Sequence, residues 1–289
     1  MSTQAVAPPV WLPWSVVDAY TATLRYMKRG VRQPDVIFGS VLFPIIFVVL
    51  FGYVFGDSIK IPGGDYRSYL MPGLFSQAIL FGSNSVAVGI ATDMSEGVID
   101  RFKTLPISRS AIVIGRAVSS LLLGLPAMVV MILCALAVGW RPTGGLGNAA
   151  LAFGLYELYG FAMIWLGILV GLLARSPQAA DVIIGIPTFL FGFISNVFVD
   201  PANMPAWLRV FANWNPISAL VTAGRQLFGN SIGPPPSGVW SLDHPVVTTI
   251  GLAIVIVAVV APDEGPPPSL GEPPRCRRSS QAHVLRRVA

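Results

Sequence analysis

The chain has 289 residues, of which 54% are hydrophobic and only 11% are charged, and its formal net charge is +5. Its mean hydropathy of +0.68 excludes a soluble globular domain, which needs more polar surface to cover its core. Several apolar runs reach the roughly 20 residues that cross a bilayer as a helix, and the alternating ten-residue segments of a β-barrel are missing, so the sequence predicts an all-α, multi-pass membrane protein.

The first expected element is an amphipathic helix over about residues 15–32. One face carries the apolar residues Val17, Tyr20, Leu24, Met27 and Val31. They recur at steps of three and four residues, which is the helical period. The basic residues fall largely elsewhere, as in a helix that lies at the membrane surface near anionic lipid headgroups. Two roles stay open: a surface anchor, or a helix that also braces a cytoplasmic partner.

Six membrane-spanning helices are expected to follow. The predicted spans are residues 36–55, 69–92, 112–138, 149–173, 182–199 and 246–261. Basic residues concentrate on the side that holds both termini and the connection between the second and third spans, so both termini are expected in the cytoplasm. Gly167 and Gly171 have a spacing that lets helices pack closely, and we expect packing within one chain rather than a dimer contact.

The connection between the second and third spans is rich in charge. Six ionisable residues lie in it: Asp93, Glu96, Asp100, Arg101, Lys103 and Arg109. Such a density cannot lie in hydrocarbon, and the basic residues place it in the cytoplasm. The pattern indicates a short helix that contacts another protein, the alternative being a polar loop that only fixes topology. We expect Arg116 to reach the membrane interface or to pair with an acid of this segment.

One acid, Glu157, lies within an apolar span, and an intramembrane acid is a candidate functional residue. It could bind a coupling proton or cation, or an exported cation. Alternatively, its carboxylate could be satisfied by neighbours such as Tyr156 or Tyr159. Polar and aromatic placement adds four more candidates for a substrate path: Asn84, Phe189, Phe193 and Asn196.

Between the fifth and sixth spans the chain is too apolar for an ordinary loop. Trp207, Phe211 and Trp214 share a helical stripe, and a second helical stretch follows over about residues 217–229. Neither stretch is long enough to span a bilayer, and tryptophan favours the membrane interface. We therefore expect an external helical hairpin, turned where Asn215 precedes a proline and so disfavours helix.

Motifs for chemistry are missing. No Gly-x-x-x-x-Gly-Lys-Ser/Thr loop is present, so the chain is not expected to bind ATP itself. The two histidines and two cysteines have no metal-ligand spacing, and no metal, cofactor or nucleic acid is expected. The sequence indicates transport rather than an enzyme.

Two groups of motifs resemble those of ABC-2 type permeases, and in particular the daunorubicin-resistance-like drug exporters of actinobacteria. The first group is Glu96-Gly97, Asp100-Arg101-Phe102, Leu105-Pro106-Ile107-Ser108-Arg109 and Gly115-Arg116. The second is Met204-Pro205-Ala206-Trp207-Leu208 followed by Asn215-Pro216-Ile217. The resemblance covers about residues 15–261.

This resemblance implies a six-span permease with an N-terminal connecting helix and a cytoplasmic coupling helix over about Glu96–Thr104. It also implies two permease chains, identical or related, and separate ATP-binding subunits that hold ATP and Mg. The residues implied to contact the ATPase are Glu96, Gly97, Asp100, Arg101, Phe102, Lys103, Leu105 and Pro106. The implied function is ATP-driven export of a hydrophobic or amphipathic molecule (a drug, antibiotic or lipid) across the plasma membrane of a bacterium.

Two other function classes stay open: a secondary transporter coupled to protons through Glu157, and a membrane scaffold without transport. The end of the chain departs from the family pattern. Residues 262–289 form a Pro- and Arg-rich tail that is expected to be disordered. The sixth span reaches only about 16 residues, or roughly 24 Å, so a shift of reading frame near residue 261 is the other explanation.

Overall fold

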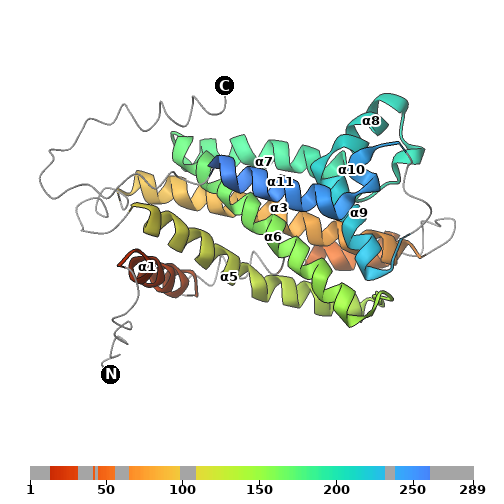
Figure 1. Ribbon diagram of the computed structural model, residues 1–289, viewed down its shortest axis with the longest axis horizontal. Helices are drawn as coiled ribbons and strands as arrows, with labels where there is room; N and C mark the ends of the chain where they lie inside the picture. The colour runs from red at the N-terminus through yellow and green to blue at the C-terminus, as the bar shows by residue number, and fades with distance from the viewer. Residues whose placement is uncertain are drawn as a thin grey trace, which may run out of the picture.

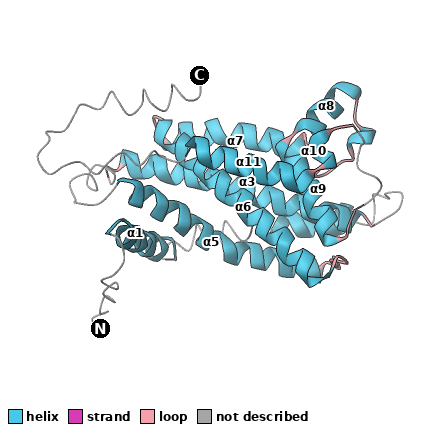
Figure 2. Ribbon diagram, in the orientation of Figure 1, coloured by secondary structure: helices cyan, strands magenta, loops and turns pink. Residues whose placement is uncertain are grey.

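The computed structural model describes residues 14–31, 42, 45–55, 65–97, 109–231 and 238–260, and the predicted tail lies outside them. Within these ranges the regular structure is helical, with no strand (Figure 2). The long helices are α1 (Trp14–Val31), α3 (Tyr66–Ser95), α5 (Arg109–Ala137), α6 (Gly145–Leu173), α7 (Pro177–Phe193) and α11 (Pro245–Val260). The short helices are the π-helix η1 (Leu50–Phe55), the 3-10 helix η2 (Pro201–Asn203), α8 (Ala206–Trp214), α9 (Pro216–Phe228) and α10 (Trp240–Asp243).

Three helices in this part of the chain are long and apolar enough to cross a membrane, namely Tyr66–Ser95, Val113–Ala137 and Gly145–Leu173. Two further apolar helices are shorter, Pro177–Phe193 and Pro245–Val260. These five correspond to the second to sixth predicted spans. Of the first predicted span, residues 36–55, the structure describes residue 42 and residues 45–55, which are helical and end in η1. The six-span arrangement stays a prediction.

The boundaries of α7 differ from the predicted span 182–199. The helix begins at Pro177 because the Ser176 side chain caps it, accepting a hydrogen bond from the amide of Ala179 at 3.1 Å. It ends at Phe193. α7 thus includes Asp181, which lies outside the predicted span, and it ends before residues 194–199 of that span.

α3 is the central helix of the bundle, packed against α6, α7 and α9 (Figure 1). Glycines on α6 allow its backbone to approach α3 closely. A Cβ atom at Gly167 would lie 2.5 Å from the Ser83 carbonyl oxygen, and one at Gly171 would lie 2.6 Å from that of Ala87. The expectation that this glycine pair packs helices within one chain is confirmed.

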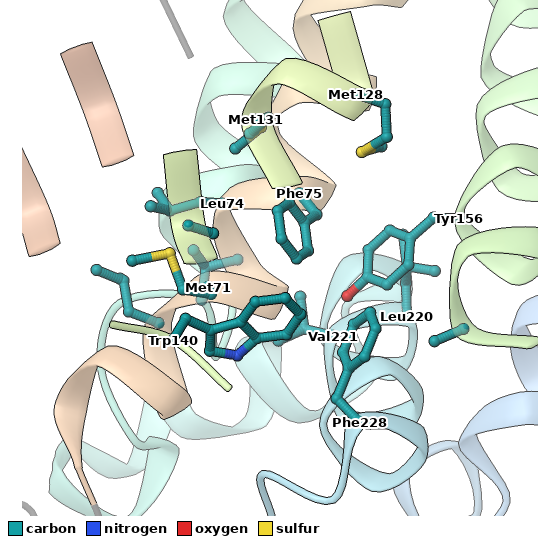
Figure 3. Packing of buried hydrophobic residues seen from close by; sticks show 14 of the residues in the cluster. Met71, Leu74, Phe75, Met128, Met131, Trp140, Tyr156, Leu220, Val221 and Phe228 are labelled. Atoms are coloured by element: carbon teal, nitrogen blue, oxygen red, sulfur yellow. The ribbon is translucent and has the colours of Figure 1, made fainter. Parts of the chain in front are cut away.

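An aromatic cluster joins the short helix α9 to the long helices (Figure 3). Phe75 of α3 and Phe228 of α9 both contact Trp140, with ring centroids 5.4 and 5.1 Å apart. Tyr156 of α6 stacks on Phe228 at 6.3 Å. Pairs of this kind stabilise beyond their buried area, so α9 is an integral part of the bundle rather than a surface loop.

Candidate functional site

Three helices meet at an ion pair near one end of the molecule. Arg116 of α5 forms a salt bridge with Asp93 of α3, with nitrogen and oxygen 3.4 Å apart, and the Asp93 side chain is only 3% exposed. The Arg116 guanidinium also lies over the ring of Tyr26 on α1, with Cζ 5.0 Å from the ring centroid. The expectation that Arg116 pairs with an acid of the charged segment is confirmed. We call Tyr26, Asp93 and Arg116 the inner node.

A glycine makes room for this pair. A Cβ atom at Gly89, one helical turn before Asp93, would collide with Nη2 of Arg116. The arginine side chain therefore lies flat against α3 on its way to the carboxylate. This contact fixes α5 to α3, while α1 packs along α5 on the other side (Figure 1).

The inner node lies where the charged segment leaves the bundle. α3 ends at Ser95, and Glu96 caps it by donating its backbone N–H to the Thr92 carbonyl at 3.0 Å. Gly97 follows with a φ of +69°, a left-handed conformation that ends the helix. α5 begins at Arg109. The other implied ATPase contacts lie outside the described residues: Asp100, Arg101, Phe102, Lys103, Leu105 and Pro106.

Three of the candidate substrate-path residues lie on two adjacent helices. The Asn84 amide of α3 donates a hydrogen bond to the Asp181 carboxylate of α7 at 2.8 Å. Phe189 and Phe193, also on α7, have ring centroids 4.4 Å apart and are 54% and 40% exposed. Asp181 was missed by sequence reasoning because the span limits excluded it.

Asn196 is placed differently from these three. It is buried, and its side-chain amide donates to the Thr222 hydroxyl at 2.8 Å and to the Ser218 carbonyl at 3.3 Å. Its backbone carbonyl accepts hydrogen bonds from the Tyr69 hydroxyl at 3.0 Å and from Arg225 at 2.7 Å. Through these hydrogen bonds Asn196 attaches the segment after α7 to α9.

Glu157 is half-buried on α6. Among the residues that the structure describes, no hydrogen bond or ion pair is found for its carboxylate. Tyr156, which was one suggested partner, donates its hydroxyl instead to the Pro72 carbonyl at 2.7 Å. Glu157 is therefore not joined to the Asn84–Asp181 pair by any polar contact seen in these parts of the chain.

Arg225 secures the far end of the bundle, and sequence reasoning did not identify this role. The guanidinium is buried, donates to the Tyr69 carbonyl at 2.9 Å and lies over the Tyr69 ring with Cζ 3.5 Å from the centroid. Burial lowers the pKa of Arg225 from its ordinary value, but arginine keeps its proton in proteins. Carbonyl dipoles and the aromatic face therefore compensate this charge.

The predicted stripe on α8 is present. Trp207, Phe211 and Trp214 are 67%, 65% and 66% exposed, so the apolar face of α8 points away from the bundle. Asn215 caps α9 by accepting from the Ile217 amide at 2.9 Å, which forms the expected turn of the hairpin. The position of this hairpin in the outer interface stays a prediction.

In the parts of the chain that the structure covers, no group of three or more His, Cys, Asp or Glu side chains could hold a metal ion.

Comparison with known proteins gives a consistent family. Residues 18–228 match the ABC-2 type transporter family. The daunorubicin resistance ABC transporter permease protein DrrB1 of Streptomyces coeruleorubidus is 29% identical over 248 residues, 84% of each chain. The probable doxorubicin resistance ABC transporter permease protein DrrC of Mycobacterium tuberculosis is 24% identical over 83% of this chain and 88% of its own length. The probable multidrug ABC transporter permease YbhR of Escherichia coli is 25% identical over 58% of this chain and 45% of its own length.

Proposed function

The chain belongs to the ABC-2 type transporter family, and on this premise we propose that it is the membrane permease subunit of an ATP-driven exporter. The observation that carries the proposal is the family match over residues 18–228, which extends from α1 to the end of α9 and includes the charged segment. The relatives named above are permeases of drug-resistance and multidrug transporters. We infer that the exported molecule is hydrophobic or amphipathic, and that the membrane is a bacterial plasma membrane.

The ATP-binding subunit is a separate chain in this proposal, because the sequence contains no phosphate-binding loop. We propose that residues 96–106 form the contact with that subunit. Asp100, Arg101 and Lys103 supply polar contacts, and Phe102 supplies an apolar one. The inner node supports this assignment, since it fixes the two helices from which the segment departs.

A mechanical role follows for the inner node. Force applied to residues 96–106 reaches α3 through Glu96 and reaches α5 through Arg109. Because Arg116 pairs with Asp93 at 3.4 Å and lies over Tyr26, α1, α3 and α5 move as one unit rather than separately. We propose that ATP-driven closure of the partner tilts these three helices together and thereby changes access to the path beside α3 and α7.

Co-purification tests the proposal. A tagged chain expressed with the genes that flank its own is expected to retain an ATP-binding subunit. Exchanging two charges, by Asp100→Arg with Arg101→Asp, keeps the net charge but is expected to lower the retained subunit at least about tenfold, since misplaced interface charges cost several kcal/mol. A control for a general effect of charge is Asp243→Arg, at an exposed acid on α10 at the other end of the bundle (Figure 1). Equal retention by all three chains would contradict the proposed contact.

A further inference from the structure

A continuous series of phenylalanine contacts runs across three segments of the chain. Its six members are Phe189 and Phe193 of α7, Phe198 after α7, Phe51 and Phe47 of the helical segment 45–55, and Phe81 of α3. Successive ring centroids along this series lie 4.4, 4.9, 5.0, 5.5 and 6.3 Å apart. We call this the phenylalanine series.

Each end of the phenylalanine series lies on a helix that also carries one member of the Asn84–Asp181 pair. On α7, Asp181, Gly185, Phe189 and Phe193 recur every fourth residue, so they form one slowly turning row on the helix surface. On α3, Phe81 precedes Asn84 by three residues, which places both on neighbouring parts of one face. Asp181 and Phe189 are therefore separated by two turns of α7, roughly 12 Å along its axis, and the Asn84–Asp181 hydrogen bond connects the two helices that carry the ends of the series.

The Asp181 carboxylate lies among exposed apolar side chains. Asp181 is exposed, while its neighbours Val182, Ile183 and Ile186 on the same apolar helix are 55%, 53% and 63% exposed. Beside the carboxylate, the Asn84 Oδ1 atom is buried and has no hydrogen-bond donor among the described residues. Acids in membrane helices are rare at lipid-facing positions and typically face an aqueous path or a cationic partner.

The chemistry of this surface fits a lipophilic cation. A carboxylate attracts the charge, and the faces of aromatic rings attract cations through their quadrupole while burying apolar groups. We propose that Asp181 and the phenylalanine series bind the cationic group and the apolar body of a lipophilic cation, and that cations of this class are what the permease exports. The second part rests on the proposed exporter function; the binding site does not need an ATPase.

A pair of probes with the same shape and opposite charge tests the site. The purified chain is placed in lipid nanodiscs, and equilibrium dialysis measures binding of radiolabelled tetraphenylphosphonium and of tetraphenylborate, with protein-free nanodiscs subtracted. The variants are Asp181→Asn, Asp181→Glu and Asp181→Lys. The control is Asp243→Asn, which neutralises an exposed acid on α10. A further variant, Glu157→Gln, tests the acid on α6 as the alternative cation site.

The expected result is a charge-specific change. Asp181→Asn weakens tetraphenylphosphonium binding at least about tenfold, equivalent to about 1.4 kcal/mol, and does not weaken tetraphenylborate binding. Asp181→Glu keeps most of the affinity, Asp181→Lys reverses the preference between the two ions, and Asp243→Asn binds as the parent chain does. The reversal by Asp181→Lys separates lost recognition from lost folding.

Three outcomes would overturn the inference. Equal loss of both probes in Asp181→Asn would show a general effect on packing. Loss in Glu157→Gln with no change at Asp181 would place the cation site on α6. Dissociation of a dimer by Asp181→Asn, with unchanged tetraphenylphosphonium binding to the remaining monomer, would show that a second copy covers this surface. If an ATP-binding subunit still co-purifies in any of these cases, only the cation site fails and the exporter proposal stands.

Discussion

Asp93→Asn is expected to destabilise the protein by about 2–3 kcal/mol. At 3.4 Å, two unit charges attract each other by about 5 kcal/mol at an effective dielectric constant of about 20, and desolvation offsets part of this. Removing one partner of a buried pair costs about 3–5 kcal/mol. The loss here is smaller because the Arg116 side chain is 18% exposed and keeps its contact with Tyr26.

Thermal unfolding in detergent measures the effect, which corresponds to a fall of about 5–10 °C in Tm for a protein of this size. A double-mutant cycle adds Arg116→Met. Because the double variant removes both charges of the Asp93–Arg116 pair, it should lose at least about 1 kcal/mol less than the sum of the single losses. Asp243→Asn, at an exposed acid, is the control and should stay within about 0.5 kcal/mol of the parent. Single losses that add within about 0.5 kcal/mol would refute the coupling.

The remaining predictions concern packing and the outer end. Gly167→Ala should cost about 1–3 kcal/mol of stability, because its Cβ would lie 2.5 Å from the Ser83 carbonyl oxygen. Gly154→Ala, on the same helix with open space around it, should be neutral or stabilising. Equal Tm values for the two variants would contradict the close approach of α3 and α6. Tyr69→Phe, which removes the hydrogen bond to the Asn196 carbonyl, should cost about 1 kcal/mol of stability. Arg225→Met should cost more and should speed proteolysis between α7 and α9. An unchanged rate of proteolysis would show that Arg225 does not hold α9 to the bundle. Lipids brominated near the headgroup should quench the fluorescence of Trp207 and Trp214. Trp207→Phe and Trp214→Phe should therefore each reduce the amount of fluorescence that these lipids quench. An unchanged amount in both variants would place α8 outside the interface.

Sequence patterns located the long helices well because the length of an apolar run and the helical period are local properties. The predicted spans 69–92 and 149–173 fall inside α3 and α6, and the face carrying Trp207, Phe211 and Trp214 was identified from spacing alone. α7 begins before the predicted span because a capping serine and a proline set its start.

Contacts between distant parts of the chain could not be predicted in the same way. Arg225 donates to the Tyr69 carbonyl, which lies 156 positions away in the sequence. The phenylalanine series joins separate segments, and no spacing of residues within them indicates that their rings meet. The polarity of Asn196 suggests a substrate contact, but a polar side chain in an apolar region can equally well bond a neighbouring helix, as Asn196 does with the Ser218 carbonyl and the Thr222 hydroxyl. The pairing of Arg116 could be predicted, because few acids lie close in sequence to the start of α5.

The most direct test of the central claim is transport by the chain reconstituted in liposomes together with its ATP-binding subunit, with tetraphenylphosphonium as the probe. The exporter account predicts that movement of the probe needs ATP and continues when an uncoupler collapses the proton gradient. Movement that continues without ATP, stops when the proton gradient is collapsed and is lost in Glu157→Gln would contradict the account and identify a proton-coupled transporter.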